Sequence, residues 1–309
     1  MTLRFLRRAS TVVVAAALTP AGTTDAQAGL RFDTVKVSTG IRLSYAEQGV
    51  GPGDPIILLH GLSDSWFSFS RVLPLLSAQR RVYALDQRGH GGSSKPRSGY
   101  KMRDLAADVI AFMDAKRIDR AIVLGHSMGS FVAQQVAVAA PKRVARLVLV
   151  GSATAPDKFA GIAQLDSLIG TMTDPIPKEF LREFQISTVY DNVPAEFIDR
   201  AVLESSRLPA HAWRALVTGL LATKAPSALA ASGIPTLVLW GEKDAYALEA
   251  EQKALVGLIR TATMVTYANT GHAPHWERPA RFARDVLAFV ASPSAMLPDS
   301  RARTTAQQP

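Results

Sequence analysis

The segment from Gly125 to Gly129, which reads G-H-S-M-G, constrains this chain more than any other. It follows the apolar run Ala121–Leu124 and precedes a helical pattern from Phe131 to Ala140. A serine in this setting is typical of a sharp strand-to-helix turn that exposes the serine hydroxyl. The flanking glycines have no Cβ atoms, so that strand and helix can approach closely. We predict that Ser127 is a nucleophile; the alternative is a plain glycine-flanked turn.

A serine hydroxyl needs a general base, and the base needs an acid that orients it. Two later apolar runs end close to such groups: Thr236–Trp240 precedes Asp244, and Ala262–Tyr267 precedes His272. The carboxyl ends of parallel strands meet at one edge of a sheet, so we expect the two side chains to lie together. Asp244 could instead cap the helix that follows it, and Asp157, after the preceding strand, is then the alternative acid.

Apolar runs alternate with helical patterns along most of the chain. Residues Phe32–Val37 and Ile41–Glu47 alternate in polarity and predict an antiparallel hairpin. Six further strands are predicted at Ile56–Leu59, Val82–Leu85, Ile122–Leu124, Leu147–Val150, Thr236–Trp240 and Ala262–Tyr267. Helices are predicted at about Trp66–Leu76, Met102–Ala115, Met128–Ala139, Ala247–Ile259 and Pro279–Ala291. This alternation predicts an α/β fold: a mostly parallel eight-stranded sheet with helices on both faces.

The strand rhythm stops after Ser152 and resumes near Ile234. The segment between, residues 153–232, contains helix-like pieces separated by prolines. We interpret it as a helical cap, inserted after the sixth strand and lying over Ser127. The core domain then comprises residues 29–152 and 233–292. Residues 293–309 have few apolar side chains, which predicts a disordered tail.

The amino terminus has the three parts of a signal peptide. Arginines at positions 4, 7 and 8 precede the apolar run Val12–Leu18, and Ala26-Gln27-Ala28 gives a small-x-small cleavage site. We predict that residues 1–28 are removed and that the mature protein is periplasmic or extracellular. A surface helix or a frayed tail is the alternative. The Arg7-Arg8 pair leaves both the general and the twin-arginine export routes open.

Composition excludes several function classes. The chain has no cysteine, so neither a disulfide nor a thiol nucleophile is available, and the spacing of its six histidines predicts no metal site. The net charge of +9 comes from scattered basic residues, which does not indicate nucleic-acid binding. No apolar run reaches the roughly 18 residues that a membrane span needs, so we expect no stable membrane insertion. The sequence leaves the oligomeric state open.

Three further motifs accompany the Ser127 turn. His60-Gly61-Leu62 follows a predicted strand, Asp86–Ser93 reads D-Q-R-G-H-G-G-S, and Gly271-His272 is followed by Glu277-Arg278-Pro279. With these motifs in this order, the chain resembles the α/β-hydrolase fold superfamily, in its esterase-like branch with a cap. The resemblance covers about Leu30 to Ser292.

The resemblance implies a catalytic triad of Ser127, Asp244 and His272, in the chain order that α/β-hydrolases use. It also implies an oxyanion hole formed by the backbone N–H groups of Leu62 and Met128. The expected reaction is hydrolysis of a small-molecule carboxylic ester or lactone through an acyl-enzyme, with no cofactor and no metal.

Relatives within this superfamily supply the alternatives. Dehalogenases and epoxide hydrolases carry aspartate at the position of Ser127, which argues against both. Carbon–carbon bond hydrolases of ring-cleavage products share the serine, the cap and the triad order, but the predicted export signal disfavours them. The second alternative is a ligand-binding protein of this fold without catalysis.

Overall fold

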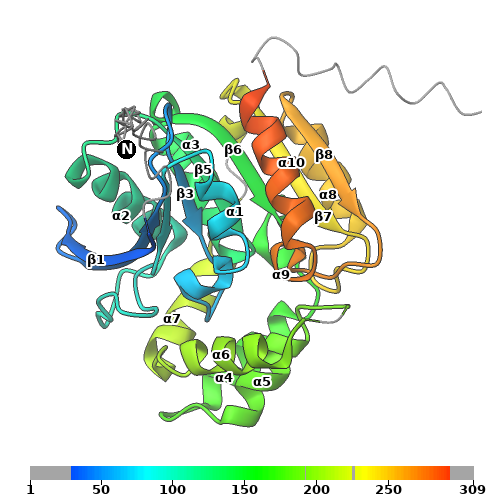
Figure 1. The fold of residues 1–309 in the computed structure, drawn as a ribbon. Coiled ribbons are helices and arrows are strands. Elements are labelled where there is room, and N and C mark those ends of the chain that lie inside the picture. Colours follow the sequence, from blue (N-terminus) through cyan, green and yellow to red (C-terminus); the bar gives the residue numbers. More distant parts are fainter. Residues whose placement is uncertain (1–28, 192, 225–226, 293–309) are drawn as a thin grey trace, which may run out of the picture.

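The computed structural model describes residues 29–191, 193–224 and 227–292 (Figure 1). The predicted signal peptide, residues 1–28, and the predicted tail, residues 293–309, lie outside these ranges.

The described residues form an eight-stranded sheet in the order β1-β2-β4-β3-β5-β6-β7-β8. The first strand pairs antiparallel with β2, and β2 pairs antiparallel with β4; the other neighbours are parallel. The strands are β1 (Arg31–Lys36), β2 (Arg42–Gln48), β3 (Ile56–Leu59), β4 (Val82–Leu85), β5 (Ala121–His126), β6 (Val144–Val150), β7 (Thr236–Gly241) and β8 (Ala262–Tyr267). The predicted mostly parallel sheet is confirmed.

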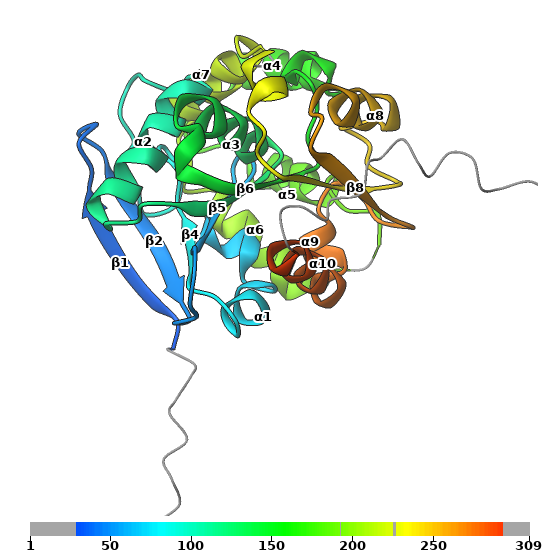
Figure 2. The ribbon, with the colours of Figure 1, turned by 90° about the horizontal axis from the view of Figure 1, so that it is seen from above.

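Helices cover both faces of the sheet (Figure 2). One face carries α2 (Met102–Ala115), α3 (Met128–Ala139) and α8 (Glu249–Leu258). The other carries α1 (Leu73–Ser77), α9 (Pro274–Glu277) and α10 (Pro279–Ala291). Each face has its own hydrophobic cluster, and for this reason β3, β4 and β5 are buried along their whole length. Strands buried on both faces read as continuous apolar runs, which made them visible in the sequence.

The single helix predicted at Trp66–Leu76 is wrong. The chain forms a 3-10 turn, η1 (Trp66–Phe69), and then the short helix α1. The hydroxyl of Ser65 accepts a hydrogen bond from the Phe67 N–H and starts the first turn. Pro74 stands in the first turn of α1, where its missing N–H costs nothing, whereas inside one continuous helix it would remove a hydrogen bond.

Four helices lie between β6 and β7, in the segment where the cap is predicted: α4 (Ile162–Thr171), α5 (Lys178–Ile186), α6 (Ala195–Ser205) and α7 (Ala210–Leu221). They gather at one end of the molecule, below the sheet in Figure 1. Trp213 of α7 is fully buried and contacts Phe180 and Phe184 of α5 edge to face, which gives this layer an apolar interior. Among the described residues no helix is long and apolar enough to cross a bilayer.

The motif Asp86–Ser93 builds the loop after β4. The two oxygens of the Asp86 carboxylate accept hydrogen bonds from the N–H groups of Trp66 and Gly92, both at 2.8 Å. Arg88 forms a buried ion pair with Asp108 of α2, at 2.7 Å. This motif therefore fixes a loop next to η1.

The start of α3 lies against the end of β3 so closely that only glycine fits at position 129. A Cβ atom on Gly129 would lie 2.2 Å from the carbonyl oxygen of Leu59.

We predict that Gly129→Ala lowers the free energy of unfolding by about 1–3 kcal/mol, the usual cost of overpacking. The matched control is Gly257→Ala in α8, where a Cβ meets nothing within 4 Å. This change should be neutral or stabilise by up to about 1 kcal/mol, because alanine is the better helix former.

Urea unfolding of both variants measures the two effects. Equal stability of Gly129→Ala and the wild type would contradict the close approach of α3 and β3.

Candidate active site

Ser127 occupies the turn between β5 and α3 with φ 51° and ψ −120°. This backbone conformation is rare for a residue with a side chain and costs of order 1–3 kcal/mol. The turn is held in place because the Ser127 N–H donates to the carbonyl oxygen of Val150, at 2.9 Å, and its carbonyl oxygen accepts from the Ser130 N–H. The predicted sharp turn with an outward-facing serine is therefore present.

Asp244 and His272 meet at the ends of β7 and β8. The imidazole Nδ1 of His272 lies 2.8 Å from Oδ2 of Asp244, and the Asp244 side chain is enclosed. The other carboxylate oxygen, Oδ1, accepts the N–H groups of Tyr246 and Ala247. Asp244 therefore holds the turn after β7 and also binds the imidazole. The alternative that it caps the following helix is wrong, because α8 begins after Leu248 and has no side-chain cap. The alternative acid, Asp157, lies on an exposed turn, η3 (Pro156–Lys158).

Three contacts fix the position of His272. A Cβ on Gly151 would lie 2.8 Å from the imidazole Nδ1, so the imidazole packs directly on the backbone after β6. The His272 N–H donates to the carbonyl oxygen of Thr188, which belongs to the inserted segment. One oxygen of the buried Glu277 accepts the N–H of Gly271, and the other accepts the N–H of Tyr190. Glu277 therefore ties the histidine loop to the insertion.

Ser127 and His272 line one cavity between the sheet edge and the inserted helices, with about 580 Å³ of atom-free space including its mouth. Its wall is mainly apolar, with Leu62, Trp276 and the insertion's Phe159, Ile162, Leu165, Phe184 and Leu220. Such a cavity with few polar groups is typical of a site for a small organic molecule.

Of the two residues predicted to form an oxyanion hole, one lines the same cavity as Ser127 and the other follows Ser127 in the chain. Leu62 lines the cavity. Met128 is the first residue of α3, so its N–H has no acceptor within the helix. The turn that carries Leu62 is braced by His60, whose Nε2 accepts the Gln87 N–H and whose Nδ1 donates to the Gly61 carbonyl oxygen.

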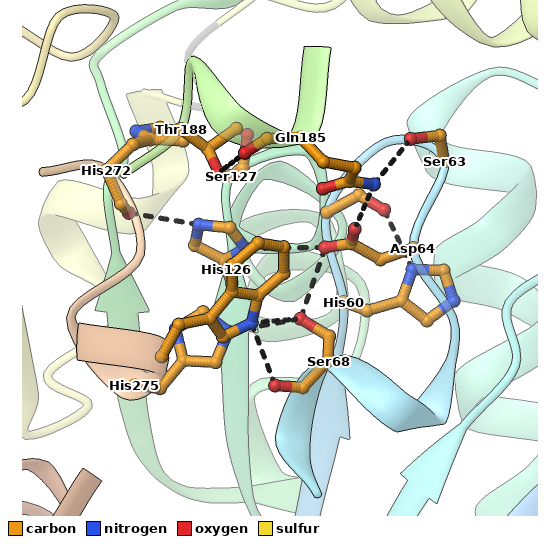
Figure 3. Close-up of polar contacts among 12 residues, drawn as sticks. His60, Ser63, Asp64, Ser68, His126, Ser127, Gln185, Thr188, His272 and His275 are labelled. Carbon is orange, nitrogen blue, oxygen red and sulfur yellow. Dashed lines mark hydrogen bonds and ion pairs between the residues drawn. The ribbon is translucent and has the colours of Figure 1, made fainter. Parts of the chain in front are cut away.

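Among the polar residues that line this cavity, Asp64 and Gln185 were not predicted as site residues from the sequence. Asp64 follows Leu62 by two positions and is buried, and Gln185 reaches it from α5 of the insertion (Figure 3). The side-chain nitrogen of Gln185 lies 3.1 Å from the Asp64 carboxylate and 2.7 Å from the hydroxyl of Ser205 in α6. Burial raises the pKa of Asp64 to about 6. The only sequence signal for this contact was the position of Asp64 beside the H-G-x turn.

The site is surrounded by buried histidines that are neutral at pH 7. Burial lowers the pKa of His60 to about 4 and that of His275 to about 3, and the nearby His272 adds to the second effect. Burial also lowers the pKa values of His90 and His126 well below their usual range. His275, on α9, lies 3.1 Å from the hydroxyl of Ser68 through its Nε2.

These pKa shifts predict that acid destabilises the fold. The unfolded chain binds protons at its histidines near pH 6.5, whereas folded His275 resists protonation down to about pH 3. Neutral His275 therefore has no effect on the pH dependence of stability above pH 6.5. Below this pH, the unfolded chain gains a proton that the folded chain does not, so the free energy of unfolding falls as the pH falls toward 3. We predict that His275→Gln, which keeps a donor for Ser68, makes the fall in melting temperature between pH 6.5 and 4.5 less steep. The same slope in the variant and the wild type would contradict a neutral, buried His275.

Comparison with known proteins gives the class. Residues 54–279 match the family model described as the alpha/beta hydrolase fold. Since this match covers most of the chain, the protein belongs to the α/β-hydrolase fold family, as the sequence motifs indicated.

Its relatives include enzymes with different reactions. The chain is 31% identical to a non-heme chloroperoxidase of Streptomyces lividans, over 84% of this chain and 99% of the relative. It is 30% identical to a 2-hydroxy-6-oxononadienedioate/2-hydroxy-6-oxononatrienedioate hydrolase of Cupriavidus pinatubonensis, over 89% of this chain and 97% of the relative.

Two solved structures extend the comparison. A hydrolase of Pseudomonas aeruginosa is similar with a TM-score of 0.73 and 26% identity, over 84% of this chain and 98% of that one. A bacterial membrane phospholipase A is similar with a TM-score of 0.72 and 26% identity, over 85% and 86%.

Proposed function

We propose that this protein is a serine hydrolase that cleaves a carboxylic ester or lactone through an acyl-enzyme intermediate. The observation that carries the proposal is the 2.8 Å contact between His272 and the enclosed Asp244, at the cavity that Ser127 lines. A carboxylate on Nδ1 fixes the imidazole tautomer, which leaves Nε2 as the atom that takes the serine proton.

The proposed reaction has two steps. The Ser127 oxygen attacks the carbonyl carbon while His272 takes the hydroxyl proton, and the alcohol leaves with that proton. Water then loses a proton to His272, attacks the acyl carbon and releases the acid and the serine. The N–H groups of Leu62 and Met128 are proposed to bind the oxyanion in both steps, where one such donor contributes about 2.7–4 kcal/mol. None of these steps requires a cofactor.

Carbon–carbon bond hydrolysis is the second candidate, because relatives about 30% identical are named for dioate substrates. A dianionic substrate is held best by cationic side chains. Among the described residues, those that line the cavity include no lysine or arginine, and they include the carboxylate of Asp64. This charge distribution favours a neutral ester or lactone over a dioate. Turnover of the dienedioate but not of any neutral ester would reverse this choice.

We propose that residues 153–232 act as a cap that sets substrate preference. In support, the insertion contributes five of the apolar cavity residues named above and the polar Gln185 and Thr188. A lid of this kind excludes water and positions the substrate.

We also propose that the protein is exported and begins at Gly29 after signal cleavage. Mass spectrometry of the mature protein from its native host tests this. An intact amino terminus on protein in the cytosolic fraction would contradict export.

The catalytic roles predict a graded loss of activity. Ser127→Ala should lower kcat on an aryl ester by about 10⁶-fold, because members of a triad act as a unit. Asp244→Asn should lower it by about 10⁴-fold, because the wrong imidazole tautomer is stabilised. The matched control is Asp157→Asn, which changes an exposed carboxylate outside this contact and should leave kcat unchanged. Steady-state kinetics on folded variants measures all three.

A near-wild-type kcat in Asp244→Asn, together with a loss in Asp157→Asn, would transfer the acid role to Asp157.

A further inference from the structure

Asp64 and His126 line the substrate cavity, but the proposed reaction uses neither. His126 directly precedes Ser127, Asp64 lies two residues after Leu62, and both line the same cavity as Ser127 (Figure 3). Both side chains are almost fully buried, with exposed fractions of 3% and 6%. Buried polar groups of this kind normally have hydrogen-bond partners.

The contacts of His126 determine which of its ring atoms carries the proton. Nε2 lies 3.0 Å from the backbone carbonyl oxygen of His272, and a carbonyl oxygen can only accept. Nε2 is therefore the donor. Burial, followed by the proximity of the ionisable groups His275 and His272, keeps the pKa of His126 low, so the ring is neutral. Nδ1 is then a bare acceptor, and among the described residues it has no hydrogen-bond partner.

The unpartnered nitrogen faces Asp64. Oδ2 of Asp64 lies 3.9 Å from Nδ1 of His126 and accepts a hydrogen bond from the hydroxyl of Ser68. Oδ1 is bound by the side-chain amide of Gln185. Two acceptors cannot bond one another, but a donor between them can lie about 2.8 Å from each. Gly61 adjoins both atoms, because a Cβ there would lie 3.1 Å from each.

We propose that Asp64 and His126 form a subsite for a hydrogen-bond donor of the substrate, a hydroxyl or ammonium group a few bonds from the scissile carbonyl. This inference rests on the proposed ester hydrolysis and specifies its substrate class. The rest of the cavity is mainly apolar, so the substrate combines an apolar body with one donor beside the ester.

The subsite should discriminate strongly against substrates that lack the donor. A methyl group in this position leaves two buried acceptors unpaired and also shields them from water, which is costly. Sites that hydrogen-bond a substrate hydroxyl reject the analogue without it far more strongly than apolar pockets reject a smaller group. We expect a ratio of at least about tenfold in kcat/KM between donor-bearing esters and their methyl isosteres.

The experiment compares esters of nearly equal shape on the full-length mature enzyme. On the acyl side, methyl 3-methylbutanoate is compared with methyl 3-hydroxybutanoate and methyl 3-aminobutanoate. On the alcohol side, propyl butanoate is compared with 2-hydroxyethyl butanoate. Comparison of the 3-hydroxy ester with the 3-amino ester shows whether the subsite prefers a hydroxyl or an ammonium group. The kcat/KM of each ester is measured from acid release at constant pH.

The variant Asp64→Asn replaces one acceptor by an amide that can donate toward His126, while it keeps the side-chain shape. The preference ratio should then fall to near one, whatever the absolute rates. The matched control is Asp54→Asn, at the opposite end of β3, which should keep the wild-type ratio. The wild-type ratio is itself a test that does not depend on the folding of any variant.

Two results would overturn the subsite. They are equal kcat/KM for every methyl and donor pair in the wild type, and an unchanged ratio in Asp64→Asn. An unchanged ratio with a uniform loss of rate indicates a purely structural role. Failure to hydrolyse any ester would instead remove the proposed function and the subsite with it.

Discussion

The close approach of three backbone segments around Ser127 is the constraint on which the rest of the site depends. A Cβ on Gly125 would lie 2.1 Å from the carbonyl oxygen of Gly129, and one on Gly129 would meet Leu59. This packing forces the chain from β5 into α3 within one residue, which holds Ser127 at a positive φ. The strain is offset by the packing of α3 between α2 and the sheet. The Ser127 hydroxyl therefore lies at the carboxyl edge of the sheet. Asp244 and His272 lie at the same edge, after β7 and β8.

The inserted helices are joined to this edge by hydrogen bonds as well as by apolar contacts. Thr188 accepts the N–H of His272, Glu277 binds the N–H of Tyr190, and Gln185 bonds to Asp64 and Ser205. These contacts connect His272, the H-G-x turn and the insertion. A displacement of the insertion would therefore disturb both His272 and the cavity wall. Under the proposed function, this couples substrate binding to chemistry.

Much of the fold could be predicted because its signals are local. Runs such as Ile56–Leu59 are strands buried on both faces, and the helix Met128–Ala139 begins after a glycine-flanked serine. The division of the segment Trp66–Leu76 into η1 and α1 was not predicted, because the apolar pattern of a helix continues across Pro74. Asp64 and Gln185 are 121 positions apart, and they meet only because the insertion folds back onto the sheet edge. No local pattern carries such a contact.

The central claim is that Ser127 is an activated nucleophile. A fluorophosphonate probe reacts with such a serine, and peptide mapping by mass spectrometry identifies the modified residue. We predict one label per chain, on Ser127, with no label on folded protein that carries His272→Ala. An unlabelled, folded wild-type protein would contradict it and would favour a ligand-binding role for the cavity.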